Sequence, residues 1–194
     1  MGALVAVIDK KGRTAAEKAL DMLEALRHRF DHSYGIATEN SVFIAKKEGK
    51  LTNEVPETPV AIGYGLSKIK PEDTPQPILE ENFALTINGR FFPQQEPSDI
   101  EFARSLLKNN PAEKAEELLK KFDGSYSFAV LHEDRIIVGR DPFGTSPLYY
   151  GGNRRFAAVA SEMRALRKLG IEKVKSFPPG TISVSYTHLT LPTN

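Results

Sequence analysis

Apolar and polar residues alternate along this chain in two kinds of pattern, and each pattern predicts a different secondary-structure element. A continuous apolar run at residues 3–8 (ALVAVI) is typical of a short strand that is buried on both faces. Apolar residues then recur every three or four positions over residues 16–26, which predicts an amphipathic helix. Thr14, followed three residues later by Glu17, predicts a capping box at the start of that helix.

The rest of the pattern predicts hairpins and helices that follow one another. Strands are predicted at residues 35–37, 41–45, 60–64, 83–87, 126–132, 135–139, 156–160, 174–177 and 181–183. Helices are predicted at residues 97–108, 111–122 and 162–169, the last of them capped by Ser161. Asn88-Gly89 is a turn signal after one strand. This order argues against a doubly wound parallel sheet and favours an α+β fold of antiparallel sheets layered with helices.

The last eleven residues, 184–194 (VSYTHLTLPTN), differ in style from the rest of the chain. They read like the in-frame translation of a sequencing adaptor, so we exclude them from fold reasoning. We therefore expect that the natural chain is cut near Ser183 and continues beyond it. The alternative is a genuine Thr-rich terminal strand.

Composition narrows the classes of function. With 40% hydrophobic residues, 26% charged residues and a net charge of +1, the sequence is typical of a globular domain and offers no basic surface for nucleic acid. No apolar stretch approaches the roughly 20 residues of a membrane helix. The chain has no cysteine, which excludes disulfides and thiolate chemistry and suits a cytoplasmic protein. His28 and His32 share a helical spacing, but the helix pattern fails there, so we predict no metal site.

The most informative stretch covers residues 123–166, and a bottom-up interpretation of it stops at a hairpin, a rigid turn and a capped helix. Four phrases stand in order: D-G with F-A at residues 123–129, G-R-D-x-x-G-x-x-P-L-Y-Y at 139–150, A-S-E-x-x-A-L at 160–166, and F-x-P-G at 177–180. With these phrases, residues 1–183 resemble the glutaminase domain of class II glutamine amidotransferases, which are N-terminal-nucleophile (Ntn) hydrolases. The A-S-E phrase favours asparagine synthetase among them.

The resemblance implies a four-layer α-β-β-α sandwich of two antiparallel sheets. It also implies that the first strand is a central sheet member beside Asn88, because residue 2 of this family is the catalytic cysteine and its own α-amino group is the base. Gly2 stands at that position and carries neither thiol nor hydroxyl. We therefore expect no intact catalytic residue and a glutaminase site that is inactive.

The remaining site residues are carried over position by position. The resemblance assigns Asn88 and Gly89 to the oxyanion hole and Asp99 to the glutamine amine. The arginine that holds the glutamine carboxylate is replaced by Gly65, and a glutamate that contacts the amine is replaced by Arg90, which reverses the charge. These changes argue against glutamine binding.

The resemblance thus implies a fragment of an asparagine synthetase, which amidates aspartate with ATP. No cofactor is expected in this domain, whereas ATP and magnesium are expected in a C-terminal synthetase domain that is missing from the chain. That domain is the expected partner, a homodimer contact is open, and no nucleic acid or membrane is expected. Two alternatives remain: a non-catalytic regulatory or interaction module, and another Ntn amidohydrolase whose true start lies upstream.

Overall fold

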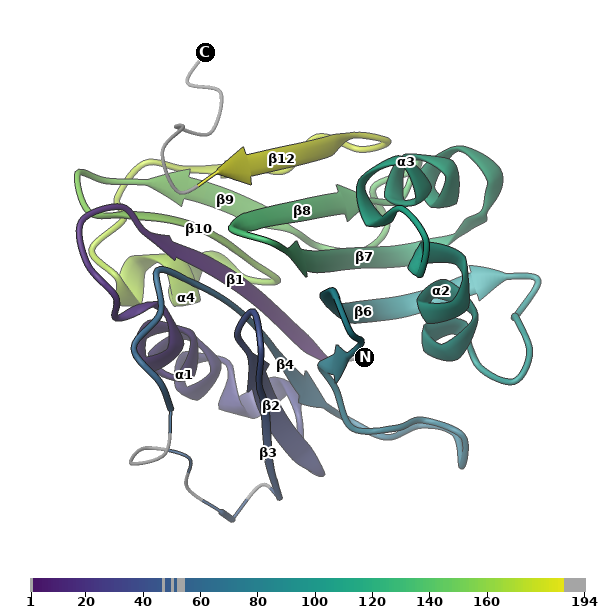
Figure 1. Ribbon diagram of the computed structural model, residues 1–194, viewed down its shortest axis with the longest axis horizontal. Helices are drawn as coiled ribbons and strands as arrows, with labels where there is room; N and C mark the ends of the chain where they lie inside the picture. Colours follow the sequence, from purple (N-terminus) through teal and green to yellow (C-terminus); the bar gives the residue numbers. More distant parts are fainter. Residues whose placement is uncertain (1, 47, 50, 52–54, 187–194) are drawn as a thin grey trace.

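The computed structural model describes residues 2–46, 48–49, 51 and 55–186, which build two stacked antiparallel sheets (Figure 1). In spatial order the sheets run β11-β9-β10-β1-β4-β2-β3 and β12-β8-β7-β6-β5. The strands of the seven-stranded sheet are β1 (Ala3–Asp9), β2 (Ser33–Ala37), β3 (Val42–Lys46), β4 (Val60–Leu66), β9 (Tyr149–Gly152), β10 (Phe156–Ala160) and β11 (Val174–Ser176). Those of the five-stranded sheet are β5 (Ile78–Leu79), β6 (Phe83–Phe92), β7 (Asp123–His132), β8 (Arg135–Arg140) and β12 (Ile182–Tyr186).

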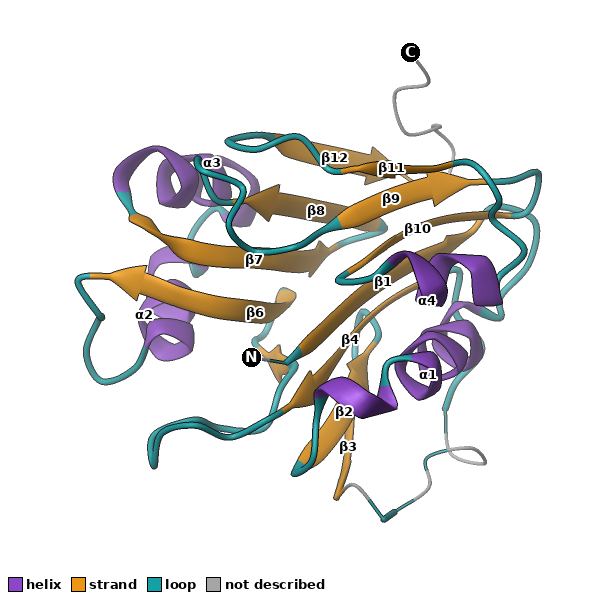
Figure 2. Cartoon of the chain, turned by 180° about the vertical axis from the view of Figure 1, so that it is seen from behind, coloured by secondary structure: helices purple, strands orange, loops and turns teal. Residues whose placement is uncertain are grey.

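Helices cover the outer faces of both sheets, as Figure 2 shows from behind. The helices are α1 (Ala15–Ala25), the short 3-10 helix η1 (Arg27–Arg29), α2 (Asp99–Leu107), α3 (Pro111–Lys121) and α4 (Met163–Lys168). Helices α1 and α4 pack on the seven-stranded sheet, and α2 and α3 pack on the five-stranded sheet. The predicted α+β sandwich of four layers is confirmed.

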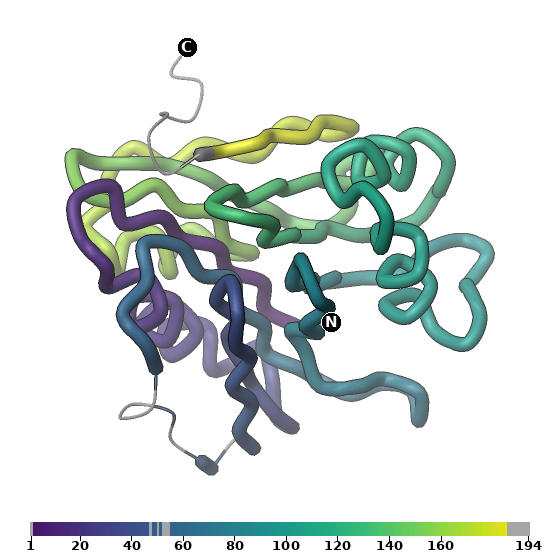
Figure 3. The backbone as a smooth tube through the Cα atoms, in the orientation of Figure 1, coloured from purple at the N-terminus to yellow at the C-terminus, as the bar shows by residue number. Residues whose placement is uncertain are grey.

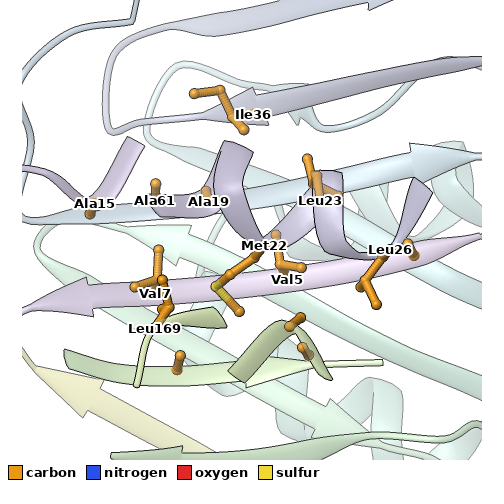
Figure 4. Packing of buried hydrophobic residues seen from close by; sticks show 14 of the residues in the cluster. Val5, Val7, Ala15, Ala19, Met22, Leu23, Leu26, Ile36, Ala61 and Leu169 are labelled. Atoms are coloured by element: carbon orange, nitrogen blue, oxygen red, sulfur yellow. The ribbon is translucent and has the colours of Figure 1, made fainter. Parts of the chain in front are cut away.

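Strand β1 explains why its sequence is apolar without interruption. Side chains alternate across a strand, so Ala3, Val5 and Val7 face α1 and α4, whereas the even-numbered residues face the space between the two sheets. Figure 4 shows Met22 of α1 close to Val5 and Val7. Fully burying side chains of this size contributes roughly 1.5–3 kcal/mol each, so both faces of β1 hold the layers together. The expectation that the first strand is a central sheet member is confirmed.

Two predicted helix caps are wrong, because tertiary contacts use the same side chains. The Thr14 hydroxyl donates to Asp9 Oδ2 at 2.7 Å instead of accepting from the first turn of α1. Ser161 does not cap α4, which begins after Glu162; its hydroxyl meets the backbone of Leu4 in β1. Both side chains therefore tie the ends of β1 to neighbouring segments.

The strand prediction fails in two places. Strand β6 does not end at Asn88-Gly89 but continues to Phe92, and the predicted turn is extended backbone paired with β7. Strand β9 lies where the sequence predicts only a rigid turn. It pairs with β10, which follows it directly in a hairpin, and with β11, which comes after α4.

The segment predicted as an adaptor is described only in part. Residues 184–186 belong to β12, an edge strand paired with β8, and residues 187–194 lie outside the described residues. The adaptor origin stays a prediction. Among the described residues, no helix combines the length and apolar character that crossing a bilayer requires.

Candidate active site

The start of β1 lies beside β6 of the other sheet (Figure 1), and Gly2 there contacts Asn88 of β6. The backbone N–H of Gly2 donates to Asn88 Oδ1 at 2.9 Å, and both residues are buried. The carbonyl oxygen of Gly2 accepts from Arg29 Nε at 3.1 Å, and Arg29 also donates to Glu162 at 2.9 Å. Both backbone groups of Gly2 are therefore held, as an N-terminal nucleophile site would require.

The A-S-E phrase holds the beginning of β1. The pairing of β1 with β10 ends at Val5 and Ala160, so the next N–H, that of Leu4, needs another acceptor. The Ser161 hydroxyl oxygen accepts that N–H at 2.9 Å, and the Ser161 N–H donates to the Leu4 carbonyl at 3.0 Å. Ser161 thus extends the ladder by one residue toward Gly2.

The G-R-D phrase supports Asn88 from behind. The Asp141 carboxylate accepts the N–H groups of residues 143, 145 and 146, the last at 2.9 Å, and so fixes the turn. The Ser146 hydroxyl contacts Ser127 Oγ at 3.1 Å and the Asn88 carbonyl at 3.5 Å. No ion pair joins Arg140 to Asp141 among the described residues; the Arg140 guanidinium donates to backbone carbonyls around the same turn.

Gly89 is required by its backbone conformation. Its φ is +130°, a region that residues with a side chain rarely adopt, and a Cβ there would collide with the carbonyl oxygen of Ser125 in β7. The Asn88-Gly89 pair therefore lets the two longest strands pass close to each other, which a turn signal does not predict.

A cavity of about 60 Å³ lies beside this site. Tyr64, Gly89, Arg90 and Asp99 are among the residues that line it, and neither Gly2 nor Asn88 is. Ser67, Asp73 and Thr74, in the loop that runs from β4 to β5, also line it; Figure 3 traces the course of that loop. Asn88 and Gly2 thus meet behind the cavity rather than within it.

Asp99, the predicted amine ligand, lies at the start of α2 and is 4% exposed. Its two carboxylate oxygens accept the N–H groups of Phe91 and Gln95, at 3.2 and 2.9 Å. The carboxylate therefore fixes the end of β6 and the loop before α2, in addition to lining the cavity.

Arg90 does not present an unpaired cation to the cavity. Its guanidinium donates to Asp73 Oδ1 at 2.5 Å. Burial works to raise the pKa of Asp73, but the N–H groups of Lys70 and Ile69 and the Arg90 charge outweigh it and lower that pKa. The Asp73 carboxylate therefore stays ionised at neutral pH. No sequence motif marks Asp73 as a partner of Arg90, because Asp73 lies in a Pro-rich loop without a periodic pattern.

Gly65, which the resemblance assigns to the position of an arginine, pairs with Ala3 of β1 and lies against the ring of Phe30. The structure thus brings Gly2, Asn88 and Gly65 together, with Gly89, Arg90 and Asp99 around the adjoining cavity. Among the described residues, His, Asp and Glu side chains nowhere gather into a group of three that could hold a metal ion.

Residues 64–168 match the family described as "Glutamine amidotransferase domain", and this span is more than half of the chain. The chain belongs to this family. The glutamine amidotransferase domain is homologous to the N-terminal domains of asparagine synthetases. It is 26% identical over 191 residues to a putative glutamine-hydrolysing asparagine synthetase of Methanocaldococcus jannaschii. The aligned region covers 86% of this chain and 33% of that protein.

Other amidotransferases resemble the domain as well. An amidophosphoribosyltransferase of the same organism is 34% identical over 102 residues, or 50% of this chain and 22% of that protein. A solved structure described as the allosteric regulatory enzyme of purine biosynthesis matches with a TM-score of 0.79 and 23% identity, over 95% of this chain and 47% of that one. The domain thus spans a third or less of the length of these curated relatives.

Proposed function

We propose that this chain is the amidotransferase-like domain of an asparagine synthetase whose glutamine-hydrolysing step is lost. The observation that carries the proposal is Gly2, which takes the nucleophile's place with its backbone held by Asn88 and Arg29. Hydrolysis through a covalent intermediate requires a sulfur or oxygen nucleophile beside its base. The chain has no cysteine at all, so donors of an oxyanion hole would have no intermediate to stabilise.

The surroundings of the cavity support the same proposal. A glutamine carboxylate needs a cation, yet Arg90 is paired with Asp73. Asp99 already accepts two backbone N–H groups. A cavity that holds benzene measures about 150 Å³, and glutamine is larger than benzene, whereas the cavity here measures about 60 Å³.

In the longer protein that we infer, a C-terminal synthetase domain would bind ATP and magnesium and activate aspartate. The amide nitrogen would then come from free ammonia or from another subunit. The present domain would serve as a structural cover of the synthetase domain, with a homodimer contact as a further role.

A second candidate is a non-catalytic regulatory or interaction module. The cavity beside Asp99 favours this candidate, because a glutaminase site that no longer catalyses can still bind a small ligand. This candidate requires saturable binding without turnover, whereas a purely structural role requires neither.

The test is ammonia release from glutamine by the purified chain, followed with a coupled dehydrogenase assay. We expect no release above the protein-free background. Release that is proportional to protein concentration and is lost in Asp99→Asn would overturn the proposal, because a contaminating glutaminase would not respond to that substitution. Titrating glutamine and glutamate while recording amide chemical shifts separates the two candidates: saturable shifts around residues 89–99 favour the regulatory module.

A further inference from the structure

The space that a side chain at position 2 would need is already occupied. A Cβ built on Gly2 would lie 2.5 Å from Cζ of Tyr64, and closer still to the Tyr64 hydroxyl and the Gly65 carbonyl oxygen. Non-bonded carbon atoms pack at about 3.5–4.0 Å. Gly2 therefore leaves no empty space in the site, because the Tyr64 ring and the Gly65 backbone carbonyl lie where the side chain would be.

The second lost position is filled in the same way. A Cβ on Gly65 would lie 2.5 Å from Cε1 of Phe30. Phe30 is 2% exposed, and its ring packs 6.0 Å from that of Tyr34, so it has little room to move away. Two neighbouring glycines are thus each covered by an aromatic ring.

Tyr64 stands between residue 2 and the cavity. It belongs to β4, where it pairs with Leu4 of β1 and Gly35 of β2, and only 5% of it is exposed. It lines the cavity that Gly2 does not line. Burial raises the pKa of the phenol, so the ring carries no charge into this position.

We propose that Tyr64 is the residue that excludes the cavity's ligands from residue 2. Its ring occupies the volume of a side chain at position 2 and separates that position from the cavity. The inference rests on the proposed function only in treating position 2 as the former nucleophile position. It implies that Gly2 and Tyr64 are a coupled pair: a side chain at position 2 costs less stability once Tyr64 becomes smaller, and the contact with the Gly65 backbone carbonyl accounts for the cost that remains.

The test compares Gly2→Cys in three backgrounds: the unchanged chain, Tyr64→Ala, and the control Tyr150→Ala. Tyr150 packs against the same inter-sheet cluster, and none of the three atoms nearest to a Cβ on Gly2 belongs to it. We expect Gly2→Cys to lower the urea midpoint by the same amount in the unchanged chain and in the Tyr150→Ala background, and by less in the Tyr64→Ala background. An equal shift in all three would overturn the proposal.

If Tyr64→Ala does not fold, Tyr64→Leu replaces it in the same comparison, because a leucine side chain lacks the ring atoms that a Cβ at position 2 would meet. Glutamine hydrolysis is measured on the same proteins. Hydrolysis by the unchanged chain would refute the proposed function and leave the midpoint comparison intact. Hydrolysis by Gly2→Cys alone at the rate of the double variant would refute the exclusion by Tyr64.

Discussion

Replacing Ser161 by alanine removes the hydroxyl that receives the Leu4 N–H at 2.9 Å. Both residues are 0% exposed, so water cannot take over as the acceptor. A buried donor that loses its partner costs about 1–3 kcal/mol. We therefore expect Ser161→Ala to lower the free energy of unfolding by that amount, which shifts the melting temperature by about 2–4 °C per kcal/mol for a domain of this size.

Urea unfolding followed by circular dichroism measures the loss, and amide hydrogen exchange locates it. The exchange of the Leu4 amide should accelerate more than that of amides in β7, because the Leu4 N–H loses its acceptor. Ser105→Ala is the matched control, since Ser105 is exposed on α2 and should change stability little. A loss below about 0.5 kcal/mol, or no local change in exchange, would show that Ser161 does not hold β1.

Two further predictions concern pH. Burial alone would raise the pKa of Asp9, but hydrogen bonds from Arg155 and Thr14 outweigh burial and lower that pKa from 3.8 to about 2. The ionised Asp9 carboxylate therefore stabilises the fold fully above pH 3.8, and this stabilisation is lost as pH falls through 2. Asp9→Asn should cost about 2 kcal/mol at neutral pH and flatten acid unfolding in that window. The hydrogen bond to Asp134, together with burial, raises the pKa of Glu39 from 4.5 to about 7. The stabilisation from protonated Glu39 is therefore full below pH 4.5 and is lost as pH rises through 7. Asp134→Asn should reduce that decline in the urea midpoint, because it removes the largest cause of the raised pKa and leaves burial.

Most of the fold is predictable from local pattern. The apolar run of β1 marks a strand with two buried faces, and the spacing in α1 marks a helix with one, so both follow from periodicity alone. Strand β9 and the second half of β6 escape prediction because their partners supply the deciding energy. Gly89 in particular is typical of a turn by composition, yet it serves a close passage of two strands.

The site is predictable as a set of positions but not as a set of contacts. The sequence predicts that Gly2 lies beside Asn88, and the hydrogen bond between them agrees with that. It does not predict that Tyr64 lies over Gly2 or that Asp73 pairs with Arg90. These contacts join segments that are distant along the chain, and no local rule connects them.

The survival of the family's phrases follows from what they hold. Ser161 ties down the start of β1, and the turn around Asp141 supports Asn88 through Ser146. Each of these hydrogen bonds stabilises the junction of the two sheets whether or not residue 2 is a nucleophile, because it satisfies backbone groups from which water is excluded. Replacing a nucleophile by glycine at position 2 removes the chemistry without unpairing any of these groups, whereas a change at Ser161 unpairs one of them. The scaffold phrases can therefore persist in a domain whose reaction is lost, and their presence alone is no measure of glutaminase activity.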